Sequence, residues 1–337
     1  MSGFVLRRLL LFLPQLLAIA IVGFALLRLL PVDPVSRIVG SFGTDEARQS
    51  AKETIGLDRS FGEQLGSFLE GLLTLDFGES FVSGDSVRAE LGDRIPVTLQ
   101  LIGIGFVLAL VIAIPLGRYI ASKVGGRIEK VTTVYALFAG AQPDFWWGLI
   151  FLFVFFFKLG WFPAPLGQLD PTQIAPDGPT RFIFIDTLVH GQFDLFVSAL
   201  KHYALPIITL TFVLTGPILK IMRQSALDVI SSDYLLYAKA SGFTPKRVRR
   251  MTARNSFAPV VTITGVLLVF ALGGAVLIET VFALPGLGRY ALSRTLDTDF
   301  PAIQGAIVFM AAFGLTVYLV MDILYALLDP RVRHSRD

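Results

Sequence analysis

The feature that most constrains this sequence is a series of long windows that contain no charged side chain. Five such windows occur, and they are 9–27, 95–117, 202–219, 255–278 and 300–321. An α-helix rises about 1.5 Å per residue, so windows of this length cross roughly 30 Å of bilayer hydrocarbon. A sixth window, 131–157, is interrupted only by Asp144. We therefore predict six membrane-spanning helices, with both chain ends on the same side of the membrane.

The composition supports a multi-pass membrane protein rather than a soluble domain. Hydrophobic residues make up 54% of the 337 residues and charged residues 16%, whereas charged residues are about a quarter of a typical soluble domain. The net charge is only +3, which gives no reason to expect a nucleic-acid partner. Because the chain has no cysteine, it has no disulfide, no thiol nucleophile and no thiolate metal site.

The distribution of lysine and arginine predicts which side of the membrane each segment occupies. Segments on the side of the N-terminus hold 17 of these residues, whereas the two short loops on the other side, 158–201 and 284–301, hold five. The positive-inside rule therefore places both termini in the cytoplasm. The long segment 31–97 holds twelve acidic and six basic residues and is expected outside. We expect the first span to be retained, since no small-residue cleavage site follows it.

The stretch SSDYLLYAKASGFTPKRVRRM (231–251), between the fourth and fifth spans, predicts a helix–turn–helix hairpin. Ser231 or Ser232 can cap the first helix, which we predict at about 232–241. Asp233 lies in its first turn and Lys239 in its last, where each charge is favourable for the helix dipole. Gly242 then occupies the position where a left-handed residue commonly ends a helix.

The second helix of the hairpin opens at Thr244 and Pro245, as its N-cap and first residue. It is basic, so it is compatible with a cytosolic loop that obeys the positive-inside rule, with anionic lipid headgroups, or with a cytoplasmic partner. The first helix contains small residues that would allow close approach to a partner and apolar residues that would anchor it there. These are Ala238, Ala240 and Gly242, and Tyr234, Leu235, Leu236 and Tyr237.

The hairpin resembles the coupling loop of ABC importer permeases, in which EAA is followed by three residues and a glycine. Leu236, Tyr237 and Ala238 stand at the EAA positions and Gly242 at the glycine, and the departures resemble the peptide and nickel branch. Other segments extend the resemblance over nearly the whole chain, among them LLRLLPVDP, RIPVTLQL, GGAVLIETVFALPGLGRYA and DILYALLDPRVR. The chain is thus similar to permease subunits of the dipeptide, oligopeptide and nickel ABC importer family.

The resemblance implies an all-α, six-helix fold of the type I ABC importer permeases, in the cytoplasmic membrane of a bacterium. A second homologous permease would complete the pathway, one or two ABC ATPase subunits would bind ATP and Mg, and an extracytoplasmic binding protein would deliver substrate. The chain has no GxxxxGK[ST] phosphate loop, so we expect no cofactor in it. The implied substrate is a di- or oligopeptide, with nickel or another small solute as the alternative.

In this family the coupling helix lies in a groove of an ATPase subunit. The resemblance assigns this role to Leu236, Tyr237, Ala238, Lys239, Ala240 and Gly242. The expected division of the chain is a first transmembrane helix (1–30), an external loop (31–97), a five-helix core (98–330) and a cytoplasmic tail (331–337). In the external loop, apolar residues at helical spacing predict an amphipathic helix, and they are Phe61, Leu65, Phe68, Leu69 and Leu72.

Two carboxylates in or beside the apolar windows are candidate pathway residues. A carboxylate at membrane depth is costly and usually faces protein or water. Asp144, which follows Pro143, either caps a helix that restarts there or meets the amino group of a peptide. Glu279 is expected to make an interhelical or gate-region contact rather than to bind substrate.

Two other classes of membrane protein agree less well with the residues. An intramembrane hydrolase would need a nucleophile and base, or metal ligands, and we find no Ser/His arrangement or HExxH motif. A secondary transporter would carry carboxylates in several spans, whereas Asp144 is essentially the one charge in mid-span. We therefore predict a non-catalytic subunit with no catalytic residue and no metal site.

Overall fold

The computed structural model describes residues 2–40 and 44–328, and the secondary structure of that part is helical, without a β-strand. The predicted tail, 331–337, lies outside the described residues. Five helices are long and apolar enough to cross a membrane. They are α1 (Ser2–Leu29), α5 (Val87–Ala121), α9 (Phe193–Ile230), α12 (Phe257–Val281) and α14 (Phe300–Leu328).

The predicted span at 131–157 is broken beside Asp144, where the sequence indicated that a helix restarts after Pro143. It consists of α6 (Arg127–Ala141), α7 (Asp144–Phe151) and a π-helical segment, η1 (Leu152–Lys158), and the two parts are bent by 108° at the break. Pro143 has no amide hydrogen to donate and disfavours a helical conformation in the residue before it. Gln142 is accordingly extended, with φ −117° and ψ 150°.

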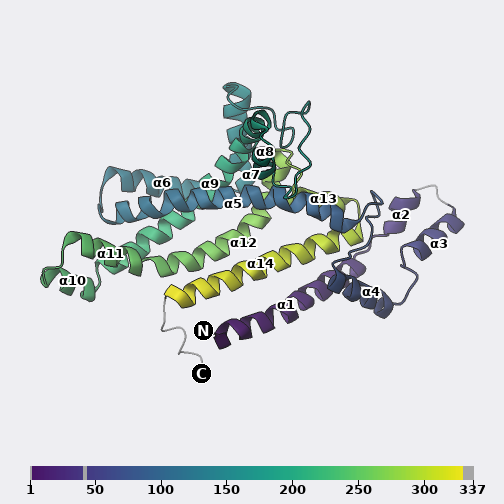
Figure 1. The fold of residues 1–337 in the computed structure, drawn as a ribbon, viewed down its shortest axis with the longest axis horizontal. Coiled ribbons are helices and arrows are strands. Elements are labelled where there is room, and N and C mark those ends of the chain that lie inside the picture. The colour runs from purple at the N-terminus through teal and green to yellow at the C-terminus, as the bar shows by residue number, and fades with distance from the viewer. Residues whose placement is uncertain (1, 41–43, 329–337) are drawn as a thin grey trace.

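The shorter helices lie mainly at the two ends of the long helices (Figure 1). The first turns of α1 and the last turns of α14 lie at the same end as α10 and α11, and α13 and the segment with α2 to α4 lie at the other. The bounds of these elements are α2 (Pro34–Val39), α3 (Asp45–Thr54), α4 (Phe61–Thr74), α8 (Ile183–Val189), α10 (Asp233–Ala240), α11 (Pro245–Asn255) and α13 (Leu287–Leu296).

The core is centred on α9 and α5. In the most apolar window of α9, 72% of the residues are buried inside the protein, against 11% for α1. Leu101 of α5 and Leu210 and Ile218 of α9 are fully buried in the largest hydrophobic cluster. By contrast, α1 packs on α14 at the edge of the bundle, where Arg8 forms a 2.8 Å ion pair with Asp322. Much of the remaining apolar surface of α1 is exposed on this chain, as at Leu10, which is 65% exposed.

The helix predicted between α3 and α5 is present as α4. Its first turn has a capping box, in which the Ser60 hydroxyl accepts from the Glu63 amide and the Glu63 carboxylate accepts from the Ser60 amide. The apolar face packs on α1, and the ring of Phe68 stacks on that of Phe24 with 5.2 Å between centres. The amphipathic spacing in this segment therefore produces a helix that lies against the end of the first span.

Candidate functional site

The α10–α11 hairpin is built from local capping interactions, and those at Gly242 and Thr244 follow the sequence prediction. Gly242 has φ +78°, a left-handed conformation that suits glycine. Its amide donates to the Lys239 carbonyl (3.0 Å), and the Phe243 amide donates to the Ala238 carbonyl (3.1 Å). These two bonds form a Schellman motif, which closes α10 and sets the direction of the chain into α11.

The N-terminal caps of the two helices differ. The Thr244 hydroxyl accepts a hydrogen bond from the Arg247 amide (3.4 Å) and caps α11 as predicted. Ser232 occupies the N-cap position of α10, but its hydroxyl donates instead to the Val229 carbonyl at 2.6 Å. The Arg247 guanidinium lies 4.1 Å from the Phe243 ring centre, so α11 is also held against the turn by a cation–π contact.

The two faces of α10 have different environments. The expectation that Leu235 and Ala238 contact a partner is wrong, because both are buried within this chain. Leu235 is fully buried and Ala238 is 3% exposed, and α10 packs on α9 and α11 of its own chain. Leu235 and Ala238 therefore attach α10 to the protein and are not available to a partner. The exposed face holds Leu236, 51% exposed, and Tyr237, 75% exposed, together with Lys239, Ala240 and Gly242.

Asp144 is the first residue of α7, immediately after the break. The N-cap residue of α7, Pro143, provides no side-chain hydrogen bond, and the Asp144 carboxylate interacts with its own main-chain amide in the first turn. This carboxylate is partly buried and lies against Gly274 of α12, where a Cβ atom would overlap its Oδ2. Asp144 therefore occupies a space on α12 that only glycine leaves open.

Glu279, at the end of α12, is fully buried and serves as the cap of another helix. Its carboxylate accepts hydrogen bonds from the Thr98 hydroxyl of α5 and from the Arg289 amide, the latter at 2.9 Å. Thr98 in turn accepts from the Leu287 amide at 2.8 Å. Thr98 and Glu279 thus pair with two amides in the first turn of α13.

The physical reason for this arrangement lies in the sequence of the turn. The N-cap of α13 is Gly286, which has no side chain to pair with the free amides of the first turn. A Cβ atom at Gly286 would overlap the Glu279 carboxylate, so glycine is required for the close approach. A carboxylate at a helix N-terminus is also favourable for the helix dipole. Glu279 therefore links α5, α12 and α13, as an interhelical contact, and Thr98 is a member of this site that the sequence interpretation missed.

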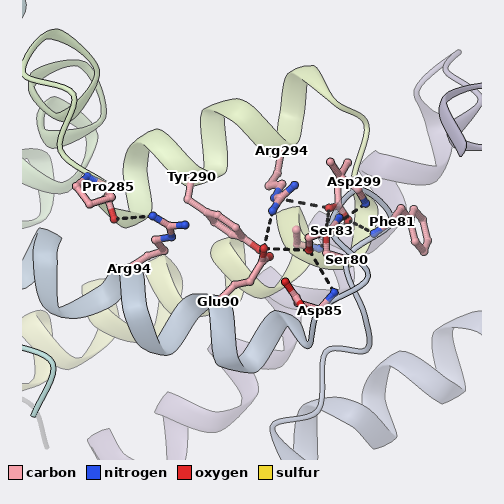
Figure 2. Close-up of polar contacts among 12 residues, drawn as sticks. Ser80, Phe81, Ser83, Asp85, Glu90, Arg94, Pro285, Tyr290, Arg294 and Asp299 are labelled. Atoms are coloured by element: carbon pink, nitrogen blue, oxygen red, sulfur yellow. Dashed lines mark hydrogen bonds and ion pairs between the residues drawn. The ribbon is translucent and has the colours of Figure 1, made fainter. Parts of the chain in front are cut away.

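A second group of polar residues, here called the polar network, connects α13 to the segment before α5. Figure 2 shows its members, which are Ser80, Glu90, Tyr290, Arg294 and Asp299. Arg294 pairs with Glu90 at 2.5 Å, and the Tyr290 hydroxyl donates to Glu90 at 2.7 Å. The buried carboxylate of Asp299 accepts from the Ser80 hydroxyl at 2.5 Å and from the Phe81 amide at 3.1 Å.

The environment of the polar network affects Tyr290 in particular. Burial, and then the hydrogen bond and charge of Glu90, raise the pKa of the Tyr290 phenol above its ordinary value of 10.0. The neutral phenol is therefore the form that this site stabilises. Because Glu90 belongs to α5, Tyr290 and Arg294 to α13, and Asp299 precedes α14, the network holds three helices in register.

The candidate residues therefore form separate sites. Asp144 lies against Gly274 and Glu279 lies five residues further along α12, about 7.5 Å along the helix axis. The α10 residues lie at the other end of the long helices (Figure 1). Among the described residues, no group of three His, Cys, Asp or Glu side chains could hold a metal ion.

Comparison with known proteins identifies the family. Residues 113–334 match the family described as "Binding-protein-dependent transport system inner membrane component", and residues 1–102 match the N-terminal region of such membrane components. The chain is 34% identical to the di/tripeptide transport system permease protein DppB of Pseudomonas aeruginosa strain UCBPP-PA14, over the full length of both chains. It is 33% identical to the dipeptide transport system permease protein DppB of Escherichia coli strain K12, again over both full lengths.

A third relative is the probable D,D-dipeptide transport system permease protein DdpB of Escherichia coli strain K12. It is 33% identical over 315 residues, which cover 93% of this chain and 92% of the relative. The predicted all-α fold of the type I ABC importer permeases is the fold of the matching family. The chain therefore belongs to the binding-protein-dependent transport system inner membrane components, and is a multi-pass membrane permease subunit of an ABC importer.

Proposed function

We propose that this chain forms half of the translocation pathway of an ATP-driven importer for di- or oligopeptides. The proposal is supported by relatives of full length whose names specify dipeptide or di/tripeptide transport. These names favour a peptide over the nickel alternative considered from the sequence. The remaining half would come from a second homologous permease, and an extracytoplasmic binding protein would deliver the peptide.

One observation carries the proposed link to an ATPase: α10 exposes Leu236 and Tyr237 while Leu235 and Ala238 attach it to the rest of the chain. An apolar, aromatic face on a short helix is suited to insertion in a groove on a partner. We propose that the partner is a cytoplasmic ABC ATPase, which binds ATP and Mg. In this arrangement both chain termini and the α10–α11 hairpin lie in the cytoplasm.

The packing of α10 suggests how a movement of the ATPase would reach the membrane. Because α10 packs on α9 and α11, and α11 continues into α12, a displacement of α10 pulls on two long helices. At its far end, α12 is fixed through Glu279 to α5 and α13. ATP binding would then favour one packing of these helices, and hydrolysis would release it, since a ligand shifts an equilibrium only through its different affinities for the two states.

The other parts of the chain have roles in the same proposal. The division into 1–30, 31–97, 98–330 and 331–337 corresponds to the first span, an external segment, the pathway-forming core and a cytoplasmic tail. Within the core, Asp144 is proposed to meet the ammonium group of a peptide. Its partly exposed position at the break between α6 and α7 supports this role.

The proposal is tested by uptake measurements in cells with and without this chain. Labelled di-, tri- and pentapeptides and nickel are each supplied to a deletion strain and to the strain complemented with the gene. We expect the deletion to lose peptide uptake and to keep nickel uptake. Loss of nickel uptake alone, or no change in either, would overturn the assignment of peptides as substrates.

A further inference from the structure

The helix α11 carries several positive charges and no negative one. Five of the nine residues from 246 to 254 are cationic and exposed, and they are Lys246, Arg247, Arg249, Arg250 and Arg254. The sequence has no acidic residue between Asp233 and Glu279. None of the five cations forms an ion pair with another described residue. The roles proposed above do not use this charge.

Four of these cations share one face of α11. Lys246, Arg250 and Arg254 follow one another at a spacing of four residues, and Arg247 precedes Arg250 by three. Side chains three and four positions apart are neighbours on the surface of a helix. The four residues therefore form one stripe along α11, here called the cationic face.

The cationic face is turned away from the rest of the chain. The helix α11 packs on α9 and α10, and two residues on its other side, Val248 and Met251, are partly buried. On that side, Asn255 Nδ2 also donates to the Tyr234 hydroxyl of α10 at 3.1 Å. The exposed cations on the opposite side are therefore open to a partner outside this chain.

The charges of the cationic face do not serve the stability of α11. Lys246 and Arg247 lie in its first turn, where the helix dipole disfavours a cation, and like charges at a spacing of four repel one another. The positive-inside rule places cations on this side of the membrane, but it does not require a stripe of them on one helix face. An anionic partner would offset the repulsion along the stripe.

The cationic face lies beside the level of the lipid headgroups. The helix α11 lies between α10 and the first turns of α12 (Figure 1), and α11 and α12 together form one candidate span, Pro245–Val281. The uncharged window of that span begins directly after Arg254. Arg250 lies about 6 Å further out along the helix axis, within the polar layer of roughly 5–7 Å on each side of the hydrocarbon. Lys246 lies about 12 Å out, where the potential of an anionic surface still acts, since the Debye length is about 10 Å.

We infer that the cationic face binds the phosphate groups of anionic phospholipids in the leaflet where α12 begins. Arginine suits this ligand, because its planar guanidinium donates two parallel hydrogen bonds to phosphate oxygens. Arg250 and Arg254 meet the headgroups directly, while Lys246 and Arg247 attract them at longer range. Lipid bound in this way holds the junction of α11 and α12 at the membrane surface. The inference requires the membrane location of the chain and not its peptide substrate.

The experiment measures lipid binding to the purified complex of this chain with its partner subunits. Native mass spectrometry follows titration with phosphatidylglycerol, which is anionic, and with phosphatidylcholine, which has the same phosphate but no net charge. The double variant Arg250→Gln, Arg254→Gln removes two charges of the cationic face, and Arg250→Lys, Arg254→Lys keeps both. The matched control is Arg59→Gln with Arg88→Gln, which removes two exposed charges from the segments beside α4 and the start of α5.

We expect wild type and the control to bind phosphatidylglycerol more tightly than phosphatidylcholine. The glutamine variant should bind phosphatidylglycerol at least about tenfold more weakly, since each cation near an anionic membrane surface contributes roughly fivefold in affinity. The lysine variant should keep most of the affinity, and added salt should weaken binding by wild type. Co-purification of the ATPase subunits should be the same for all variants.

The inference is overturned if the glutamine variant binds phosphatidylglycerol like wild type, or if wild type binds phosphatidylcholine equally well. Loss of the ATPase subunits with the lipid retained would assign the cationic face to an acidic protein surface instead. Thermal unfolding shows whether each variant is folded. If the glutamine variant does not assemble, Arg254→Gln alone carries the test with an expected loss of about fivefold in affinity, and an unchanged affinity there would overturn the inference.

Discussion

Glu279 of α12 accepts a hydrogen bond of 2.9 Å from the main-chain amide of Arg289 in the first turn of α13. The same carboxylate accepts from the Thr98 hydroxyl of α5, so one fully buried side chain joins three helices. This contact caps α13 from a different helix, because the N-cap itself is glycine. Glu279 lies at the end of α12 that is remote from α10. In the proposed coupling, it would hold that end of α12 in place while the end near α10 moves.

Two substitutions of Glu279 should therefore distinguish its role as a hydrogen-bond acceptor from the effect of its negative charge. Glu279→Ala leaves buried amides of α13 and the Thr98 hydroxyl without this acceptor, and we expect a loss of about 1–3 kcal/mol in stability. Glu279→Gln keeps one acceptor oxygen and should cost less. The measurement is thermal unfolding of the purified complex. Thr280→Ala, on the exposed side of the same turn, is the control, and equal effects at positions 279 and 280 would contradict the capping role.

The Glu90–Arg294 pair of the polar network should show strong energetic coupling. Both side chains are largely buried, 11% and 13% exposed, and a double-mutant cycle with Glu90→Gln and Arg294→Gln is expected to give a coupling of about 1–3 kcal/mol. The Asp93–Arg181 pair is a matched control, since its side chains are 63% and 52% exposed at 3.0 Å. We expect that pair to give less than about 1 kcal/mol. Comparable coupling in the two cycles would contradict the structural role of the network.

The raised pKa of Tyr290 predicts a loss of stability at alkaline pH. A group whose pKa is higher in the folded state contributes stability that is present below its unfolded pKa, about 10, and is lost as the pH rises toward the folded value. Unfolding midpoints measured between about pH 9 and about pH 11.5 should fall more steeply for wild type than for Tyr290→Phe. If the unfolding midpoint of Tyr290→Phe fell with rising pH as steeply as that of wild type, the Tyr290 phenol would not contribute to the pH dependence of stability.

The two faces of α10 should respond differently to substitution. Leu235→Ala removes a fully buried side chain, and we expect it to destabilise the complex by about 2–5 kcal/mol. Tyr237→Ala removes a side chain that is 75% exposed and should leave folding unchanged while lowering co-purification of the ATPase and peptide uptake. Both are measured by thermal unfolding, co-purification and uptake. If Tyr237→Ala kept wild-type uptake and ATPase association, α10 would not be the docking element.

Asp144→Asn tests whether a charge in the pathway is required. The amide keeps the shape of the side chain and an acceptor oxygen for the main-chain amide of residue 144, so a capping role would tolerate the change. If the carboxylate meets the ammonium group of a peptide, the half-saturating peptide concentration for uptake should rise about tenfold, a loss of about 1.4 kcal/mol. Asp177→Asn, in an exposed loop before α8, is the control for a lost carboxylate. Unchanged uptake by Asp144→Asn would remove Asp144 from the pathway.

Features determined by neighbouring residues in the sequence could be predicted well. The long apolar helices follow from uncharged windows, the end of α10 from Gly242, the start of α11 from Thr244, and α4 from apolar residues at helical spacing. The break before α7 was expected from Pro143, but the 108° bend was not. A proline indicates where a helix is interrupted, whereas the packing of α7 against α9 and α12 determines its direction.

Features that depend on distant contacts could not be predicted. The Thr98 hydroxyl and the Glu279 carboxylate are 181 positions apart in the sequence, and nothing local indicates that they share the amides of α13. The burial of Leu235 and Ala238 likewise depends on α9 and α11, so the sequence interpretation assigned Ala238 to the wrong face. A threonine at the start of an otherwise apolar span is the one signal that could have indicated Thr98.

The most direct test of this account is peptide accumulation in proteoliposomes that contain this chain, its partner permease and the ATPase subunits, with the binding protein supplied on the side of the substrate. The account predicts that labelled dipeptide accumulates only when ATP and Mg are present on the ATPase side, and that Tyr237→Ala in this chain abolishes most of the accumulation. Equal accumulation without ATP, or without the ATPase subunits, would contradict it.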